Sequence, residues 1–191
     1  VKGLFNNHGF RDRVKLSGVN SINWARIVAQ IVYYVVAGVA LGAPQRPARY
    51  VVPTGNFGDV FAGYAARRMG LPMAGLVVAT NINDILERTI RTGRYEVRGV
   101  EPTSSPSMDI QVSSNFERLL FDAHGRDSGA VRRLMAGLAQ SGSFVIDAPA
   151  LAAIRADFAA ARADEAEVAA MIRRTLAQAG YLLDPHTAVG M

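Results

Sequence analysis

The chain has 191 residues, half of them hydrophobic, which is enough to bury the core of one large domain. It contains no cysteine, so a disulfide framework and a thiolate metal site are excluded, and its three histidines are too far apart in sequence to suggest a zinc site. The net charge is +5, but the basic residues, nearly all arginine, are scattered among acidic ones, which argues against nucleic-acid binding.

The first long element that the sequence predicts is a helix over residues 20–41, with Asn20 or Ser21 as its N-cap. Its apolar residues nearly surround it. Gln30 interrupts the apolar run, which is too short to span a membrane, so we expect a buried helix and no membrane partner. No signal peptide is visible, which favours a cytoplasmic protein.

Strands and helices then alternate along the chain. Such alternation predicts an α/β fold with a mostly parallel, twisted sheet and helices on both faces. Asp84 and Glu87 suggest a capping box at the start of the second of these helices. The buried strands are expected at residues 50–53 and 76–79, and the helices at residues 60–69 and 85–91.

The pattern becomes helical after Pro102, with a short turn at the end of the chain. We therefore expect three regions: an α/β core over residues 1–110, a helical layer or subdomain over 111–180, and a C-terminal turn over 181–191. The helices are expected at residues 116–123, 131–139, 149–161 and 165–180, and the turn at residues 187–190.

A glycine-rich turn, Gly55-Asn56-Phe57-Gly58-Asp59, lies where the first strand ends and a helix begins. Helix N-termini present unpaired N–H groups, and glycines let the backbone close around an anion. The turn lacks the Gly-Lys-Ser/Thr of a Walker loop and the third glycine of a dinucleotide fingerprint. It therefore predicts a phosphate site, with an ordinary tight strand-to-helix turn as the alternative.

Residues 52–59, Val-Pro-Thr-Gly-Asn-Phe-Gly-Asp, resemble the segment that holds the phosphate of pyridoxal phosphate (PLP) in threonine synthases, which are tryptophan-synthase-like (fold type II) PLP enzymes. Residues 16–26, 79–84 and 184–190 resemble three further segments of that family, in the same order. The resemblance implies PLP as cofactor. It also implies a carbon–oxygen lyase that converts O-phosphohomoserine and water to threonine and phosphate.

The same resemblance implies roles for individual residues. Thr187 matches the residue that hydrogen-bonds the pyridine nitrogen of the cofactor. Asn20 and Arg26 match positions that contact the phosphate of the substrate. The cofactor phosphate would be held, mainly through backbone N–H groups, by Gly55, Asn56, Phe57, Gly58 and Asp59.

The Schiff-base lysine of the family has no counterpart in this chain. Lys2 and Lys15 lack its Ser-x-x-Phe-Lys-Asp setting, and residues 10–12 carry arginine where the imine needs lysine. We therefore expect no catalytic residue in this chain and no activity from it alone. The chain starts at Val1 and stops just after a motif, so we expect the C-terminal portion of a longer protein, monomeric or homodimeric.

Two other functions stay open, namely another fold-type-II PLP enzyme, such as a dehydratase or β-replacement enzyme, and a non-catalytic phosphate-binding module. An anion site at Asn20 and Arg26 would favour threonine synthase, because only a phosphorylated substrate needs it. Asn81 and Asn83 fit a strand-end turn better than an active site. His186, a lone histidine beside a proline, fits a structural role better than that of a proton shuttle.

Overall fold

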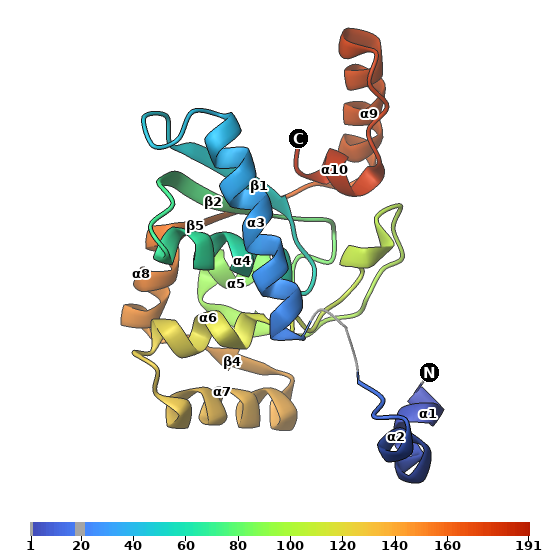
Figure 1. Cartoon of the computed structure of the whole chain (residues 1–191), viewed down its shortest axis with the longest axis vertical. Coiled ribbons are helices and arrows are strands. Elements are labelled where there is room, and N and C mark those ends of the chain that lie inside the picture. The colour runs from blue at the N-terminus through green and yellow to red at the C-terminus, as the bar shows by residue number, and fades with distance from the viewer. Residues whose placement is uncertain (1, 18–21) are drawn as a thin grey trace.

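The computed structural model describes residues 2–17 and 22–191. At its centre lies a sheet in the strand order β1–β2–β5 (Figure 1), in which both strand pairs are parallel. The expected α/β class with a parallel sheet is confirmed. Parallel strands place their carboxyl ends at one edge, so the loops after β1 and β2 open at the same edge. The strands are β1 (Ala48–Pro53), β2 (Met73–Thr80) and β5 (Phe158–Arg162).

Two short helices, α1 (Lys2–Asn6) and α2 (His8–Arg13), precede the long helix α3 (Trp24–Ala40). The expected cap at Asn20 or Ser21 is wrong in position, because α3 begins at Trp24 and the Asn23 side chain accepts a hydrogen bond from Ala25 N at 2.9 Å. Asn20 and Ser21 themselves lie outside the described residues. Among the helices that the structure describes, none is long and apolar enough to cross a membrane.

The first strand is half-buried rather than buried. Val52 faces the core, whereas Val51, which points to the opposite face of the sheet, is 46% exposed. An apolar run is typical of a parallel strand that is covered on both faces, but in β1 only the face that carries Val52 packs on the core.

The two helices expected after β1 and β2 are present as α4 (Gly58–Arg68) and α5 (Ile85–Thr92). The capping box proposed for α5 is wrong, because the Asp84 side chain makes no cap hydrogen bond. Its carboxylate instead pairs with Arg88 at 2.7 Å and with Arg162 at 3.4 Å. Arg88 is nearly buried, so this charge pairing takes precedence over the local cap.

The second half of the chain is less helical than expected. The helix expected over 149–161 ends at Asp157, and residues 158–162 form β5, because pairing with β2 overrides the helix propensity of three alanines. The expected final turn is the short helix α10. The elements here are β3 (Arg94–Glu96), the 3-10 helix η1 (Pro106–Met108), α6 (Phe116–Ala123), α7 (Ser128–Ser141), β4 (Ser143–Val145), α8 (Ala148–Asp157), α9 (Glu165–Ala179) and α10 (Pro185–Val189).

A small apolar cluster ties the C-terminal helices to the end of the sheet. Ala79 at the end of β2 and Met108 of η1 pack with Val168 of α9 and Val189 of α10. The cluster explains why α10 lies at the base of α9, beside the sheet, while the rest of α9 projects away (Figure 1). The three expected regions stay a prediction, although β5 joins a strand of the second region to the sheet of the first.

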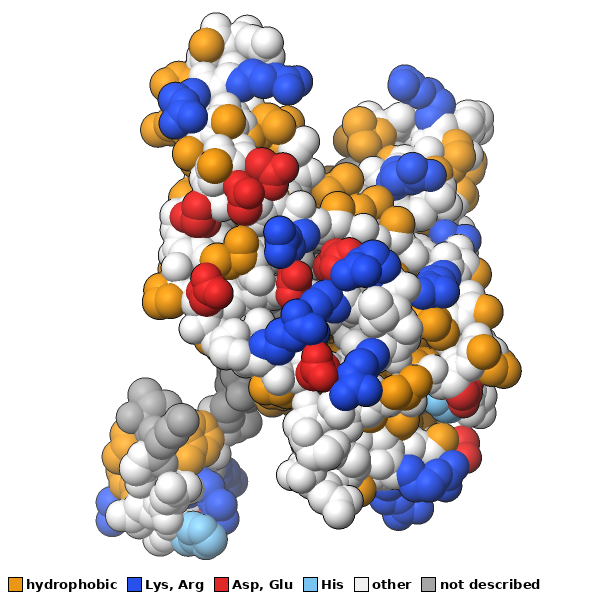
Figure 2. All heavy atoms as spheres, turned by 180° about the vertical axis from the view of Figure 1, so that it is seen from behind, with side chains coloured by type: hydrophobic (Ala, Val, Ile, Leu, Met, Phe, Trp, Pro, Cys, Tyr) orange, Lys and Arg blue, Asp and Glu red, His pale blue; other side chains and the backbone are white. Residues whose placement is uncertain are grey.

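Basic and acidic side chains are mixed on the surface. The face in Figure 2 shows arginine and lysine beside aspartate and glutamate, with no long stripe of one sign. Glu96, for example, pairs with Arg94 and Arg98, each at 3.1 Å. This distribution accords with the scattered charge read from the sequence.

Candidate functional site

The loop over residues 55–59, here called the cup loop, follows β1 and leads into α4. Phe57 adopts a left-handed backbone conformation, with φ of 64°, which residues other than glycine rarely adopt. Its ring is fully buried and packs against Phe116 at 5.2 Å and Phe158 at 5.5 Å between ring centroids. Burial of this ring offsets the backbone cost and anchors the loop.

The carbonyl groups of the cup loop are tied to the segment before α6. Gly55 O accepts a hydrogen bond from Ser113 Oγ at 2.8 Å. Asn56 O accepts two from Asn115, from its backbone N and its Nδ2, both at 3.1 Å. Oxygens that would repel an anion are thus committed to protein donors.

The N–H groups of the same loop are less committed. Gly58 N donates to Asn56 Oδ1 at 2.9 Å. Within the described part of the chain, no group accepts a hydrogen bond from the N–H of Gly55, Asn56 or Phe57. With the N-terminus of α4 at its end, the loop offers donors and partial positive charge to an anion.

Gly55 has no room for a side chain. A Cβ at this position would lie 2.8 Å from the main-chain oxygen of Ser107 and 3.2 Å from Met108 Cα. The cup loop and η1 are therefore in direct backbone contact. A glycine is needed here for close approach.

A cavity of about 180 Å³ opens in front of the cup loop. It brings Arg26 of α3 to the loop that the sequence singled out, 30 residues further along the chain. The lining also includes His186, for which the sequence favours a structural role, and Ser107 and Met108 of η1. The lining residues are Arg26, Gln30, Pro53, Gly55, Asn56, Gly58, Asp59, Ser107, Met108 and His186.

Of the sequence-predicted site residues that the structure describes, Phe57 and Thr187 are not in this lining. Phe57 supports the loop from the core. Thr187 lies in α10 next to His186, and its hydroxyl donates a hydrogen bond to the Asp184 carboxylate. Asn20 lies outside the described residues, so its role stays a prediction.

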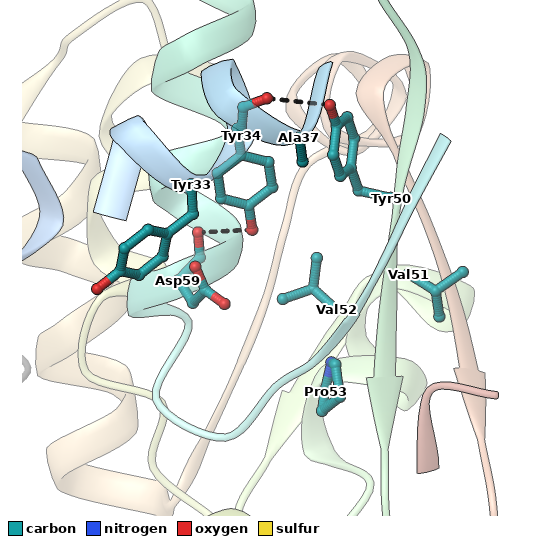
Figure 3. A pocket seen from close by; sticks show the side chains of 8 residues that line it. All are labelled: Tyr33, Tyr34, Ala37, Tyr50, Val51, Val52, Pro53 and Asp59. Atoms are coloured by element: carbon teal, nitrogen blue, oxygen red, sulfur yellow. Dashed lines mark hydrogen bonds between the residues drawn. The ribbon is translucent and has the colours of Figure 1, made fainter. Parts of the chain in front are cut away.

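Asp59 also lines a second cavity, of about 220 Å³, between α3 and β1 (Figure 3). Figure 3 shows Tyr34 directed at the start of α4, where its hydroxyl donates to the main-chain oxygen of Asp59 at 3.0 Å. Asp59 Oδ1 is buried and has no hydrogen-bond partner among the described residues. Burial raises the pKa of the Asp59 carboxyl above its ordinary value, although the nearby Tyr34 hydroxyl opposes that shift.

Asn81 and Asn83 lie in a buried polar cluster behind η1 and are absent from the cavity lining. This position outside the cavity lining agrees with the sequence prediction, which favours a strand-end turn over an active-site role for both residues. Across residues 2–17 and 22–191, no three His, Asp or Glu side chains gather closely enough to hold a metal ion.

No protein-family model matches the chain. It is 50% identical, over all of its 191 residues, to threonine synthase from Pseudomonas aeruginosa, of which it spans 41%. Its fold matches the crystal structure of PLP-bound threonine synthase from Brucella melitensis with a TM-score of 0.95 and 62% identity, over 99% of this chain and 41% of that one. The yeast threonine synthase structure matches with a TM-score of 0.89 and 38% identity, over 99% of this chain and 40% of that one.

These likenesses extend over the whole chain, whereas the four sequence motifs covered only parts of it. They agree with the architecture of the parallel sheet and its helices. The chain is therefore similar over its whole length to threonine synthases, and it spans about two fifths of the length of the relatives it matches.

Proposed function

We propose that this chain supplies the phosphate-binding part of a PLP-dependent threonine synthase, which converts O-phosphohomoserine and water to threonine and phosphate. The observation that carries the proposal is the cavity that joins Arg26 to the cup loop. The Arg26 guanidinium adds positive charge to the N–H groups that would hold the phosphate of the cofactor, which suits a second phosphate on the substrate. The PLP bound to the Brucella melitensis relative supports the choice of cofactor.

The cup loop fits the phosphate group of PLP. The carbonyls of Gly55 and Asn56 accept hydrogen bonds from residues 113 and 115, and three N–H groups of the loop have no acceptor among the described residues. The absence of a side chain at Gly55 keeps the backbone close. When bound, PLP supplies an electron sink for the reacting carbon atoms. The role of this chain is to hold the phosphate of PLP and so to orient the pyridine ring.

Arg26 is the proposed ligand of the substrate phosphate. It lies in the first turn of α3, and its guanidinium can pair with two phosphate oxygens at once. Asn20 is proposed as a second ligand on the sequence resemblance alone. This anion site favours threonine synthase over a dehydratase, whose substrate carries no phosphate.

Thr187 is the proposed partner of the pyridine nitrogen. It lies in α10, and its neighbour His186 lines the cavity. A neutral hydroxyl at this place suits replacement chemistry. Because its hydroxyl donates to Asp184, the proposal requires the hydroxyl to rotate towards the ring.

The imine-forming lysine is proposed to come from a part of the enzyme outside this chain. Lys15 is exposed and is not part of the cavity lining. The proposed reaction therefore belongs to a longer protein that contains this chain, which we propose to be cytoplasmic.

The proposal predicts distinct consequences for substrate and cofactor when Arg26 is changed in the full-length protein. In the Arg26→Ala variant we expect KM for O-phosphohomoserine to rise about tenfold to a hundredfold, because a charge-assisted hydrogen bond contributes about 1.5–3 kcal/mol. The PLP dissociation constant, read from the imine absorbance, should change less than about threefold. Phosphate release measures the reaction.

Arg49→Ala is the matched control, since Arg49 is exposed on β1 and does not line the cavity. Equal losses of substrate and cofactor affinity in Arg26→Ala would remove Arg26 from the substrate site. A full-length protein that binds no PLP would contradict the proposed function itself.

A further inference from the structure

The η1 segment forms one wall of the phosphate cavity. Ser107 and Met108 line it, and the main-chain oxygen of Ser107 lies so close to Gly55 that a Cβ there would approach to 2.8 Å. A displacement of η1 would therefore change the space available to a phosphate on the cup loop. The question is what holds η1 in place.

Behind η1 lies a cluster of buried polar groups centred on Asp109. Its Oδ1 accepts hydrogen bonds from Asn81 Nδ2 at 2.8 Å and Thr103 Oγ1 at 2.7 Å, and its Oδ2 accepts one from Thr103 N at 2.8 Å. Burial alone would raise the pKa of Asp109, but the hydrogen bonds from Thr103 and Asn81 outweigh it and leave the pKa below its ordinary value. The back of η1 is thus held by an ionised carboxylate.

On the cavity side, η1 is held by a histidine. His186 Nε2 accepts a hydrogen bond from the Ser107 N–H at 3.2 Å. An imidazole nitrogen that accepts carries no proton, so the proton of the neutral ring resides on Nδ1. Nδ1 lies 3.4 Å from Asp184 Oδ1, which supports that assignment.

Asp184 also sets the direction of α10. As the N-cap, its Oδ1 accepts hydrogen bonds from the N–H groups of His186 at 3.0 Å and Thr187 at 3.2 Å. One carboxylate thus orients the helix and the imidazole that the helix carries. His186 then transmits that orientation to Ser107, which is 79 residues away in sequence.

We propose that His186 is a positioning residue that fixes η1 against the cup loop and so sets the shape of the cofactor-phosphate cavity. The inference rests on the proposed function, because it assigns His186 to the PLP site of that enzyme. In this role the His186 imidazole transfers no proton. It accepts one hydrogen bond, from the Ser107 N–H, in a fixed direction.

The test compares His186→Leu with His186→Gln in the full-length protein. Leucine has no acceptor, whereas the glutamine carbonyl can accept from Ser107 N–H. We expect His186→Leu to raise the PLP dissociation constant about threefold to tenfold, which corresponds to one neutral hydrogen bond, and His186→Gln to restore it to within about twofold. At saturating PLP, kcat should change less than KM for O-phosphohomoserine.

His124→Leu is the matched control. His124 has a similar pairing, with Nε2 3.4 Å from Asp147 and Nδ1 2.7 Å from Leu120 O, but it is not part of the cavity lining. This variant should lower the melting temperature and leave the PLP dissociation constant unchanged.

Three results would overturn the inference. They are wild-type PLP affinity in His186→Leu, affinity in His186→Gln as weak as in His186→Leu, and an equal loss of affinity in His124→Leu. Failure of the unmodified full-length protein to show an imine band would instead contradict the proposed function, and the inference with it.

Discussion

At the scale of single residues, Asp59 is unusual because it places a carboxyl group at the edge of a site that we propose for an anion. Its Oδ1 is buried without a hydrogen-bond partner among the described residues, and burial raises its pKa from an ordinary 3.8. The Tyr34 hydroxyl of α3 lies beside it, and Arg26 of α3 and His186 of α10 line the same cavity as Asp59. A neutral Asp59 would also oppose phosphate binding less than a charged one.

The raised pKa makes a prediction about stability. When the pKa of a carboxyl group is higher in the folded than in the unfolded state, its contribution to the free energy of unfolding is fully present at pH values below the unfolded pKa. This contribution is lost as the pH rises through the folded pKa. The free energy of unfolding of Asp59→Asn should therefore exceed that of the wild type by a margin that grows as the pH rises from about 4. Urea titrations at several pH values measure it.

Asp122 offers a control of opposite sign. The hydrogen bond from the Tyr64 hydroxyl lowers the pKa of Asp122, so its contribution is present above the unfolded pKa and is lost as the pH falls. Asp122→Asn should lose stability most near neutral pH. The same pH dependence in both variants would contradict the assignment of Asp59.

At the scale of elements, the α3–α4 crossing sets the place of Arg26 relative to the cup loop. Gly63 permits that crossing, because a Cβ there would lie 2.6 Å from Tyr34 Cε1 and 2.7 Å from Tyr34 Cζ. Tyr34 is buried and also bonds the start of α4. The ring therefore has little freedom to move aside.

We expect Gly63→Ala to destabilise the fold by about 1–3 kcal/mol, as overpacking does. Gly137→Ala is the matched control, since it is the same change inside a helix but meets its nearest atom, Ser143 O, at 3.4 Å. It should stabilise by about 0.5–1 kcal/mol, because alanine has the higher helix propensity. Thermal denaturation of the two variants measures both, and shifts of the same sign would contradict the close crossing.

At the scale of the whole molecule, α3 leaves an apolar stripe uncovered. Ile27, Ile31 and Tyr34 are buried against the core, whereas Val32 and Val36 on the other side are 56% and 61% exposed. Further exposed residues of the same helix are Val28, Tyr33, Val35 and Val39. A contiguous apolar face of this kind indicates a contact surface.

We expect the 191-residue chain, when purified by itself, to self-associate through this stripe. Sedimentation velocity should show an average mass that rises with concentration, and the double variant Val32→Ser, Val36→Ser should reduce that rise. Val145→Ser, an equally exposed valine on β4, is the control. A monomer at all concentrations would contradict the expectation.

Local patterns sufficed for much of this protein. Apolar runs and glycine stops located β1, β2, α4 and α5 to within a few residues, because such runs reflect which side chains must leave water. The cup loop was identified because its chemistry is contained in five consecutive residues. The family resemblance added its relation to Arg26 and residues 184–190.

Other features depend on contacts between distant segments, which become visible in the folded chain. Residues 158–162 form a strand because β2 offers a partner, and Asp84 pairs with Arg88 and Arg162 rather than capping its helix. The η1 wall, and the hydrogen bond that His186 accepts from it, leave no periodicity or local spacing in the sequence. The five consecutive residues of the cup loop suffice to predict a tight, glycine-rich turn between β1 and α4, although its conformation also depends on the packing of Phe57 against Phe116 and Phe158. The rest of the cavity was decided by tertiary packing, which brings side chains together whatever their separation along the chain.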